Sequence, residues 1–99
     1  MKYIAEYIDL LDEEIEGAKT YAEKYVQFKA ENEITWANKF KEMSNAELQH
    51  STVIHEYLVQ KINQLKTVYQ APTEMQEIWD KKHAKYIERT AWIKQMLSM

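Results

Sequence analysis

Apolar side chains recur along most of the chain at alternating steps of four and three residues. In the N-terminal part this row consists of Ile4, Ile8, Leu11, Ile15, Ala18, Ala22 and Tyr25. Steps of this kind place side chains on one face of an α-helix, so the row predicts a helix from about residue 2 to residue 30. A second, largely aromatic row flanks the first and contains one acid: Tyr7, Glu14, Tyr21 and Phe28.

Two more rows predict two more helices. The first predicts a helix over about 33–70 and consists of Ala37, Phe40, Ser44, Glu47, Ser51, Ile54, Leu58, Ile62 and Leu65. Asn32 is its expected N-cap, and Pro72 ends it because the residue before a proline is pushed out of the helical region. The last row predicts a helix over about 73–97 and consists of Trp79, His83, Tyr86, Thr90, Ile93 and Leu97. Since both connections are short, neighbouring helices should run antiparallel.

Composition supports a single all-α domain over residues 1–99. The chain has one glycine and one proline, and turns in β-folds use these residues heavily. A chain of 99 residues buries only a modest core, and association into oligomers is a common remedy.

Charge and apolar content exclude several partners. Lysine and arginine number 13 against 16 acids, and no basic stripe stands out, so we expect no nucleic acid partner. No apolar run approaches the roughly 20 residues that span a bilayer, so we expect no membrane partner. The absence of cysteine removes thiolate metal sites and cysteine nucleophiles and fits a cytoplasmic location.

Two ionisable residues interrupt the apolar row of the second helix. Glu47 lies within the row, and His50, three residues on, shares its face. The spacing alone is a weak signal, because Asp80 and His83 form a second acid-x-x-His pair. The stronger signal is the position of Glu47 and His50 in an apolar row, since an unpaired buried charge costs several kcal/mol.

Glu14 is the corresponding acid of the first helix. Gly17 and Ala18 leave room beside it, whereas Glu16 shares a face with other charged residues and is the second choice. The midpoint between 14 and 47 falls in the predicted turn, so both acids should lie level, ~25 Å from it by helical rise. Two carboxylates and an imidazole at one level suit iron, manganese or zinc.

The third helix adds no ligand at that level. Asp80 and His83 should lie some ~15–20 Å away by helical rise, and residues 92–95 hold no carboxylate. One chain therefore supplies half of a dinuclear site, and a two-fold dimer would supply Glu14, Glu47 and His50 twice. We expect His83 to be a hydrogen-bonded seam histidine or an interface residue, and His55 an ordinary surface residue.

The segments EEIEGAKTYAEKY and AELQHSTVIHEYL resemble the first half of a rubrerythrin or ferritin-like sequence. The likeness covers about residues 4–66 and lies in Glu14 with Tyr21, and in Glu47 with His50 about 33 residues downstream of Glu14. Ferritin-like bundles carry a Glu from each of two helices and Glu-x-x-His from each of two others. The likeness implies a four-helix bundle completed by homodimerisation, or a higher even-numbered oligomer, with Glu47 bridging two metals and with Glu14 and His50 as terminal ligands.

The resemblance also implies a function. It implies two iron ions per dimer, with manganese or zinc as alternatives, and ferroxidase or peroxide-reducing activity with no catalytic residue beyond the metal ligands. The short encapsulated ferritins build such a centre across a subunit interface, although the shell-targeting peptide of that group and the rubredoxin cysteines of rubrerythrins are not found in this sequence. The alternatives are a non-enzymatic helical dimerisation module with a buried polar layer, and a phage or mobile-element structural protein with a vestigial ferritin-like fold. Three side chains are expected to be packing anchors: Trp36, Trp79 and Trp92.

Overall fold

Three helices make up the described chain. The computed structural model describes the backbone of residues 2–68 and 73–99, and the side chains of residues 4–65 and 76–99. The helices are α1 (Lys2–Ala30), α2 (Ile34–Val68) and α3 (Thr73–Leu97), and no strand occurs in these ranges. The all-α prediction is confirmed, whereas the predicted end of the second helix near residue 70 lies outside the described residues.

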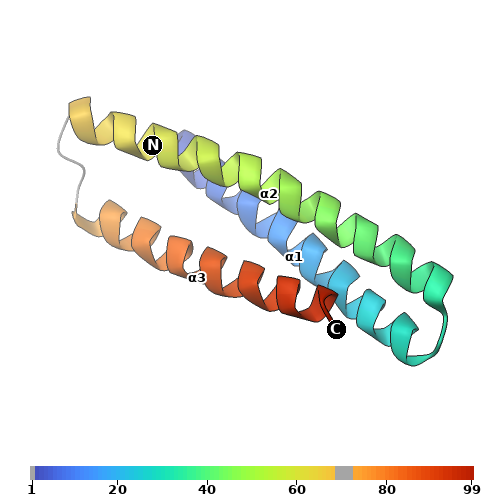
Figure 1. Ribbon diagram of the computed structural model, residues 1–99. Coiled ribbons are helices and arrows are strands. Elements are labelled where there is room, and N and C mark those ends of the chain that lie inside the picture. Colours follow the sequence, from blue (N-terminus) through green and yellow to red (C-terminus); the bar gives the residue numbers. More distant parts are fainter. Residues whose placement is uncertain (1, 69–72) are drawn as a thin grey trace.

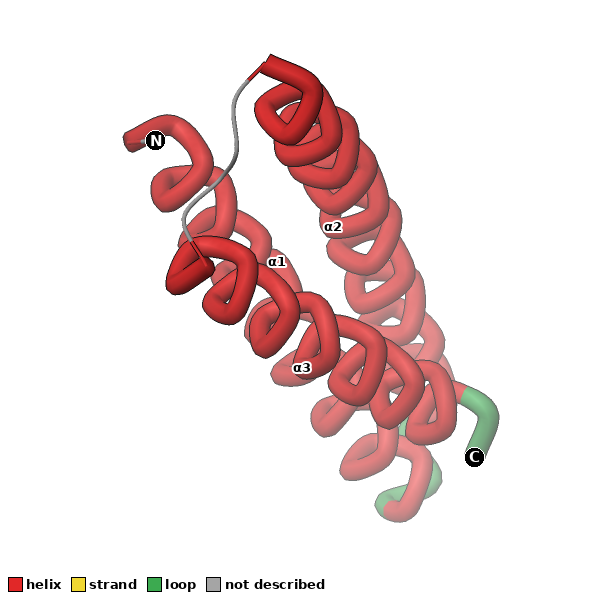
Figure 2. The backbone as a smooth tube through the Cα atoms, turned by 90° about the vertical axis from the view of Figure 1, so that its left-hand side faces the viewer, coloured by secondary structure: helices red, strands yellow, loops and turns green. Residues whose placement is uncertain are grey.

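The helices form an elongated bundle of 55 × 17 × 17 Å. α1 and α2 run antiparallel along most of its length, and α3 turns back beside them (Figure 1). α3 packs chiefly against α1, and the view along the bundle shows it lying alongside that helix (Figure 2). Among the residues that the structure describes, no helix combines the length and apolar character that crossing a membrane requires.

The core consists mostly of the rows expected from the sequence. The buried apolar side chains of α1 are Ile8, Leu11, Ile15, Ala18, Ala22 and Tyr25, and they form one cluster with Ala37, Leu48 and Leu58 of α2 and Ile93, Met96 and Leu97 of α3. Ile62 of α2 is also buried. The prediction that Trp36 and Trp92 are packing anchors is wrong, because each side chain is more than half exposed. Trp92 lines a pocket between α1 and α3 without being buried there.

The turn between α1 and α2 corrects the role expected for Asn32. This residue has a positive φ of 61°, its N–H bonds to the carbonyl of Lys29, and the N–H of Glu33 bonds to the carbonyl of Phe28. This pair of bonds is the Schellman motif, in which a left-handed residue closes a helix. Asn32 therefore ends α1 rather than capping α2, and the first turn of α2 uses the carbonyl of Glu33, which accepts from Ala37.

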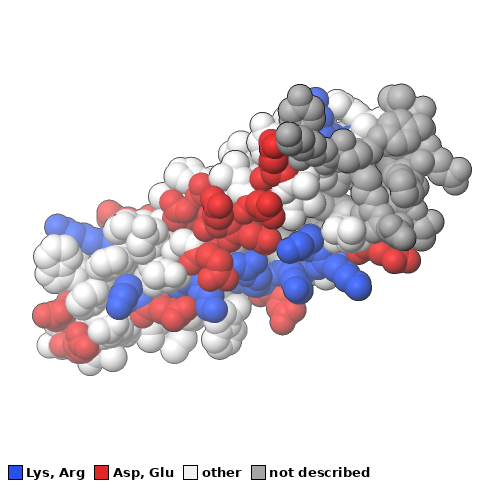
Figure 3. Space-filling model, turned by 180° about the vertical axis from the view of Figure 1, so that it is seen from behind, with Lys and Arg blue, Asp and Glu red and all other residues white. Residues whose placement is uncertain are grey.

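Ion pairs fasten α3 to the outer side of α1. Asp12 accepts from Lys82 and from Arg89, each at 3.2 Å, and Arg89 also pairs with Glu16 at 2.7 Å. Acidic and basic side chains accordingly lie next to one another on the face shown in Figure 3. These pairs lie on the side of α1 that α3 covers.

Candidate metal centre

Glu14, Glu47 and His50 lie together on the α1–α2 hairpin. Nδ1 of His50 is 3.4 Å from Oε2 of Glu14 and 3.6 Å from Oε1 of Glu47. One ligand atom from each residue lies within 4.8 Å of the other two. The predicted meeting of these three side chains at one level is therefore present in the fold.

The helix phase places this group on the side of α1 away from α3. Asp12 and Glu16 hold α3, and Glu14 is two residues from each, which on an α-helix is a rotation of about 200°. The same pairing removes Glu16 as a ligand candidate, since its carboxylate binds Arg89. The choice of Glu14 over Glu16 is thus supported by where the third helix packs.

The three side chains differ in their exposure. Glu14 and Glu47 are 23% and 26% exposed, whereas His50 is 59% exposed. The sequence predicted a buried face, and for the single chain this is wrong: the carboxylates lie in the groove between the helices and the imidazole stands at its edge. The group is closed on the side of the hairpin and accessible on the other.

The two carboxyls of the group affect each other's acidity. A hydrogen bond with the Glu14 carboxyl raises the pKa of Glu47 most; burial and then repulsion from Glu14 raise it further, and His50 opposes the rise. Oε2 of Glu14 is buried and accepts no hydrogen bond from a described residue, although Nδ1 of His50 lies 3.4 Å from it. Two carboxyls this close favour either a shared proton or a cation between them.

Apolar and aromatic side chains extend along the hairpin on both sides of the three residues. Tyr7 and Tyr57 are in contact on one side, with their tilted rings 4.6 Å apart between centroids; on the other, Phe40 contacts Phe28 at 5.4 Å and Tyr21 at 6.1 Å. We call this surface the open face, and its exposed apolar members are Leu10, Met43 and Tyr57. The acidic group therefore lies within an apolar surface.

The other histidines form a separate cluster. The ring of His55 stacks on Tyr86 at 4.1 Å and on His83 at 5.0 Å, and Trp79 lies against both imidazoles. The expectation that His55 is surface is wrong, whereas His83 is an interface residue as predicted. The signal was available: His55 is seven residues from both Leu48 and Ile62, which are buried.

Burial changes the acid–base behaviour of this second histidine. The pKa of His55 is lowered, first by burial and then by repulsion from His83, with Glu56 acting in the opposite direction. Its Nε2 is buried without a hydrogen-bond partner in the described part of the chain. These features indicate a neutral ring packed between α2 and α3.

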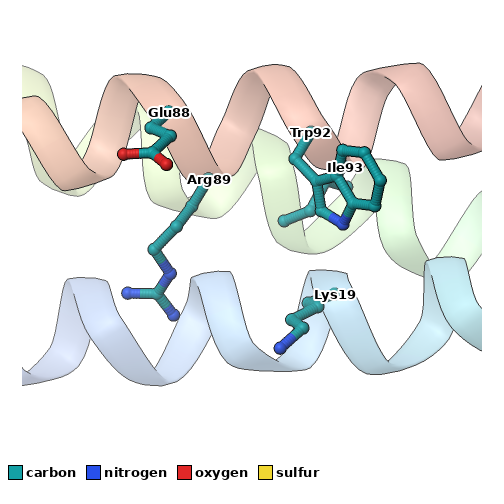
Figure 4. A pocket seen from close by; sticks show the side chains of 5 residues that line it. All are labelled: Lys19, Glu88, Arg89, Trp92 and Ile93. Atoms are coloured by element: carbon teal, nitrogen blue, oxygen red, sulfur yellow. The ribbon is translucent and has the colours of Figure 1, made fainter.

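A pocket of about 190 Å³ between α1 and α3 is a weaker candidate. Its lining consists of Lys19, Glu88, Arg89, Trp92 and Ile93. The guanidinium of Arg89 extends towards α1 (Figure 4), where Asp12 and Glu16 neutralise it. The pocket therefore lacks the cluster of ligand atoms that distinguishes the group at Glu14.

Comparison of the chain with protein-family models, with curated proteins and with solved structures found no match in any of the three. The side chains themselves therefore carry the inference of function. Among the described residues, Glu14, Glu47 and His50 are the one group of three or more acids and histidines whose ligand atoms converge.

Proposed function

We propose that this chain is a ferritin-like metal-binding protein whose Glu14, Glu47 and His50 form half of a di-metal centre. The observation that carries the proposal is the convergence of two carboxylates and an imidazole within 4.8 Å. Oxygen and nitrogen ligands of this kind suit iron, manganese and zinc. The mutual repulsion of the two carboxyls is a cost of the metal-free fold that a divalent cation would remove.

A second copy of the chain would complete the centre. Three protein ligands are too few for two metal ions, and the open face exposes Leu10, Met43 and Tyr57 around the group. Contiguous apolar surface is a typical site of association, and a two-fold axis through this face would bring the same three ligands in twice. The result would be a four-helix bundle made from two α1–α2 hairpins.

Each ligand has a distinct role in this proposal. By the ferritin-like resemblance, Glu47 would be the carboxylate that holds both ions, whereas Glu14 and His50 would each hold one. A bound iron pair would supply the electrons that reduce dioxygen or peroxide, which is ferroxidase or peroxide-reducing chemistry. The protein would fix the geometry, and the dimer contact would exclude bulk water from the ligands.

Anaerobic titration with Fe(II) tests the proposal. We expect about one iron per chain, a diferric absorbance on admission of oxygen, and an even-numbered oligomer by light scattering. Glu47→Gln should abolish iron uptake, whereas Glu42→Gln, which removes an exposed acid of the same helix, should leave it unchanged. Wild-type protein that takes up no metal while remaining dimeric would overturn the proposal.

That last result would favour the alternative function. The raised pKa of Glu47 is also what a buried polar layer produces when two carboxyls share one proton. In a non-enzymatic dimerisation module, Glu47→Gln would change stability or oligomeric state. Neither the wild type nor the variant would take up metal.

A further inference from the structure

Gly17 is the chain's only glycine, and it lies in the interior of the 29-residue helix α1. Glycine in a helix interior is destabilising relative to alanine, because its backbone loses more freedom on folding. Glycine is often found where the backbone has a positive φ, but Gly17 does not have one. The absence of a side chain at position 17 therefore needs another explanation.

The space above Gly17 is occupied by Glu47. A Cβ atom added at position 17 would lie 3.0 Å from Oε2 of Glu47, and 3.5 and 3.6 Å from its Cδ and Cγ. The Glu47 side chain thus lies directly against the backbone of α1. Its other oxygen, Oε1, is the one that faces His50 at 3.6 Å.

We propose that Gly17 is a positioning residue for the Glu47 carboxylate. Without a Cβ at position 17, the carboxylate lies across the α1–α2 groove with Oε1 towards His50 and Oε2 over α1. A methyl group at position 17 would force the Glu47 carboxylate to shift by a few tenths of an ångström, because the added carbon would lie only 3.0 Å from Oε2. This inference rests on the proposed function, in which Glu47 is the bridging ligand.

Gly17→Ala separates this role from a structural one. We expect the metal-free variant to be at least as thermally stable as the wild type, because alanine favours the helix. Its dissociation constant for Fe(II), measured anaerobically, should rise by about 10-fold or more, the range found when residues that orient a metal ligand are changed. An unchanged dissociation constant would overturn the inference.

Thr20→Ala is the matched control. Thr20 is exposed on the same helix, and its replacement also raises helix propensity without adding atoms near Glu47. It should leave the dissociation constant as in the wild type. A loss of affinity equal to that of Gly17→Ala would mean that helix stiffness, and not the space over position 17, controls binding.

A double-mutant cycle tests whether Gly17 acts through Glu47. Glu47→Asp shortens the side chain and should weaken binding in the wild-type background. In the Gly17→Ala background the same change should cost clearly less, because the longer carboxylate is already displaced. Strictly additive losses would contradict the mechanism.

A metal-free measurement distinguishes this inference from the function on which it rests. Nuclear Overhauser contacts between the α protons of Gly17 and the γ protons of Glu47 should appear in the wild type without any metal. Their absence would overturn the positioning role even if the protein binds iron. Their presence in a protein that binds no iron would leave the packing of Glu47 on Gly17 established and remove only the metal.

Discussion

The hydroxyl of Ser44 donates a 2.7 Å hydrogen bond to the backbone carbonyl of Ala18. Both residues are fully buried, and they lie within about one turn of Glu47 and Glu14. The bond joins α2 to α1 where water cannot replace either partner. It therefore joins the two helices next to Glu14 and Glu47.

Ser44→Ala should lower the free energy of unfolding by about 1 kcal/mol, the net worth of a typical buried hydrogen bond. Ser51→Ala is the control, since Ser51 is equally buried but bonds to Leu48 of its own helix. Ser51→Ala should lower the free energy of unfolding less, because both substitutions gain the same helix propensity and only Ser44→Ala breaks a contact between helices. Urea denaturation of both variants measures the difference, and equal losses would argue against a special role for the bond between helices.

Glu47→Gln should stabilise the metal-free protein while removing metal binding. The folded-state pKa of Glu47 is raised above 4.5, so the unfolded chain releases this proton at a lower pH than the folded chain. The folded state is therefore penalised as pH rises from about 4.5 through the raised pKa, and the penalty persists at neutral pH. We expect a gain of about 0.5–1 kcal/mol near pH 7.

The gain in stability from Glu47→Gln should shrink towards zero near about pH 4, where the wild-type Glu47 carboxyl is itself protonated. Thermal denaturation in the presence of a chelator, at both pH values, checks this. Glu42→Gln, at an exposed site on α2, should show no comparable pH-dependent gain. A variant that is less stable than the wild type near neutral pH would show that the Glu47 charge is stabilising without metal.

His55 should make the packing of α3 sensitive to acid. Its folded-state pKa is lowered from 6.5, so the unfolded chain takes up this proton first as pH falls. Stability is fully present above about pH 6.5 and is lost as pH falls through the lowered pKa. His55→Phe keeps a ring against Tyr86 and removes the titration, so the variant should lose less stability than the wild type between about pH 7.5 and pH 5. Urea unfolding across this range measures both slopes, and identical slopes would contradict the prediction.

Arg89→Gln should weaken the attachment of α3 to α1. The substitution removes pairs with Asp12 and Glu16, which are partly exposed and together worth about 0.5–1 kcal/mol. Lys85→Gln removes an exposed cation of the same helix that forms no ion pair with a described residue, and it should have little effect. Because salt screens such pairs, the difference between the two variants should narrow at high ionic strength; a difference independent of salt would point to packing by the Arg89 stem.

The helices, and the height along the bundle at which Glu14 and Glu47 meet, could be predicted from the sequence because both depend on residues close together in the chain. Rows at helical spacing located the core, and equal distance from a short turn placed Glu14 opposite Glu47. The accessibility of His50 was not predictable in this way, because it depends on which helix or chain covers the hairpin. The side of α1 that α3 occupies depends on Arg89 meeting Asp12 and Glu16, and these residues lie far apart in the sequence.

Other differences between expectation and structure also have local causes. Asparagine favours both the start of a helix and the left-handed position that ends one, so the residue type at 32 could not decide between them. Trp36 and Trp92 are large and apolar, but size does not show whether a neighbouring helix reaches them. His55 lies seven residues from both Leu48 and Ile62, which are buried, and this spacing already argued against an ordinary surface position.

The left-handed conformation of Asn32 has a consequence for how this protein tolerates change. The backbone bonds at Asn32 and Glu33 fix the rotational phase with which α2 leaves the turn. Inserting or deleting a single residue there would rotate α2 by about 100° about its axis and carry Glu47 off the side that Glu14 occupies. Surface loops usually tolerate an added or missing residue. In this turn, such a change would separate Glu14 from Glu47, which lie ~25 Å from it, while both helices stayed intact.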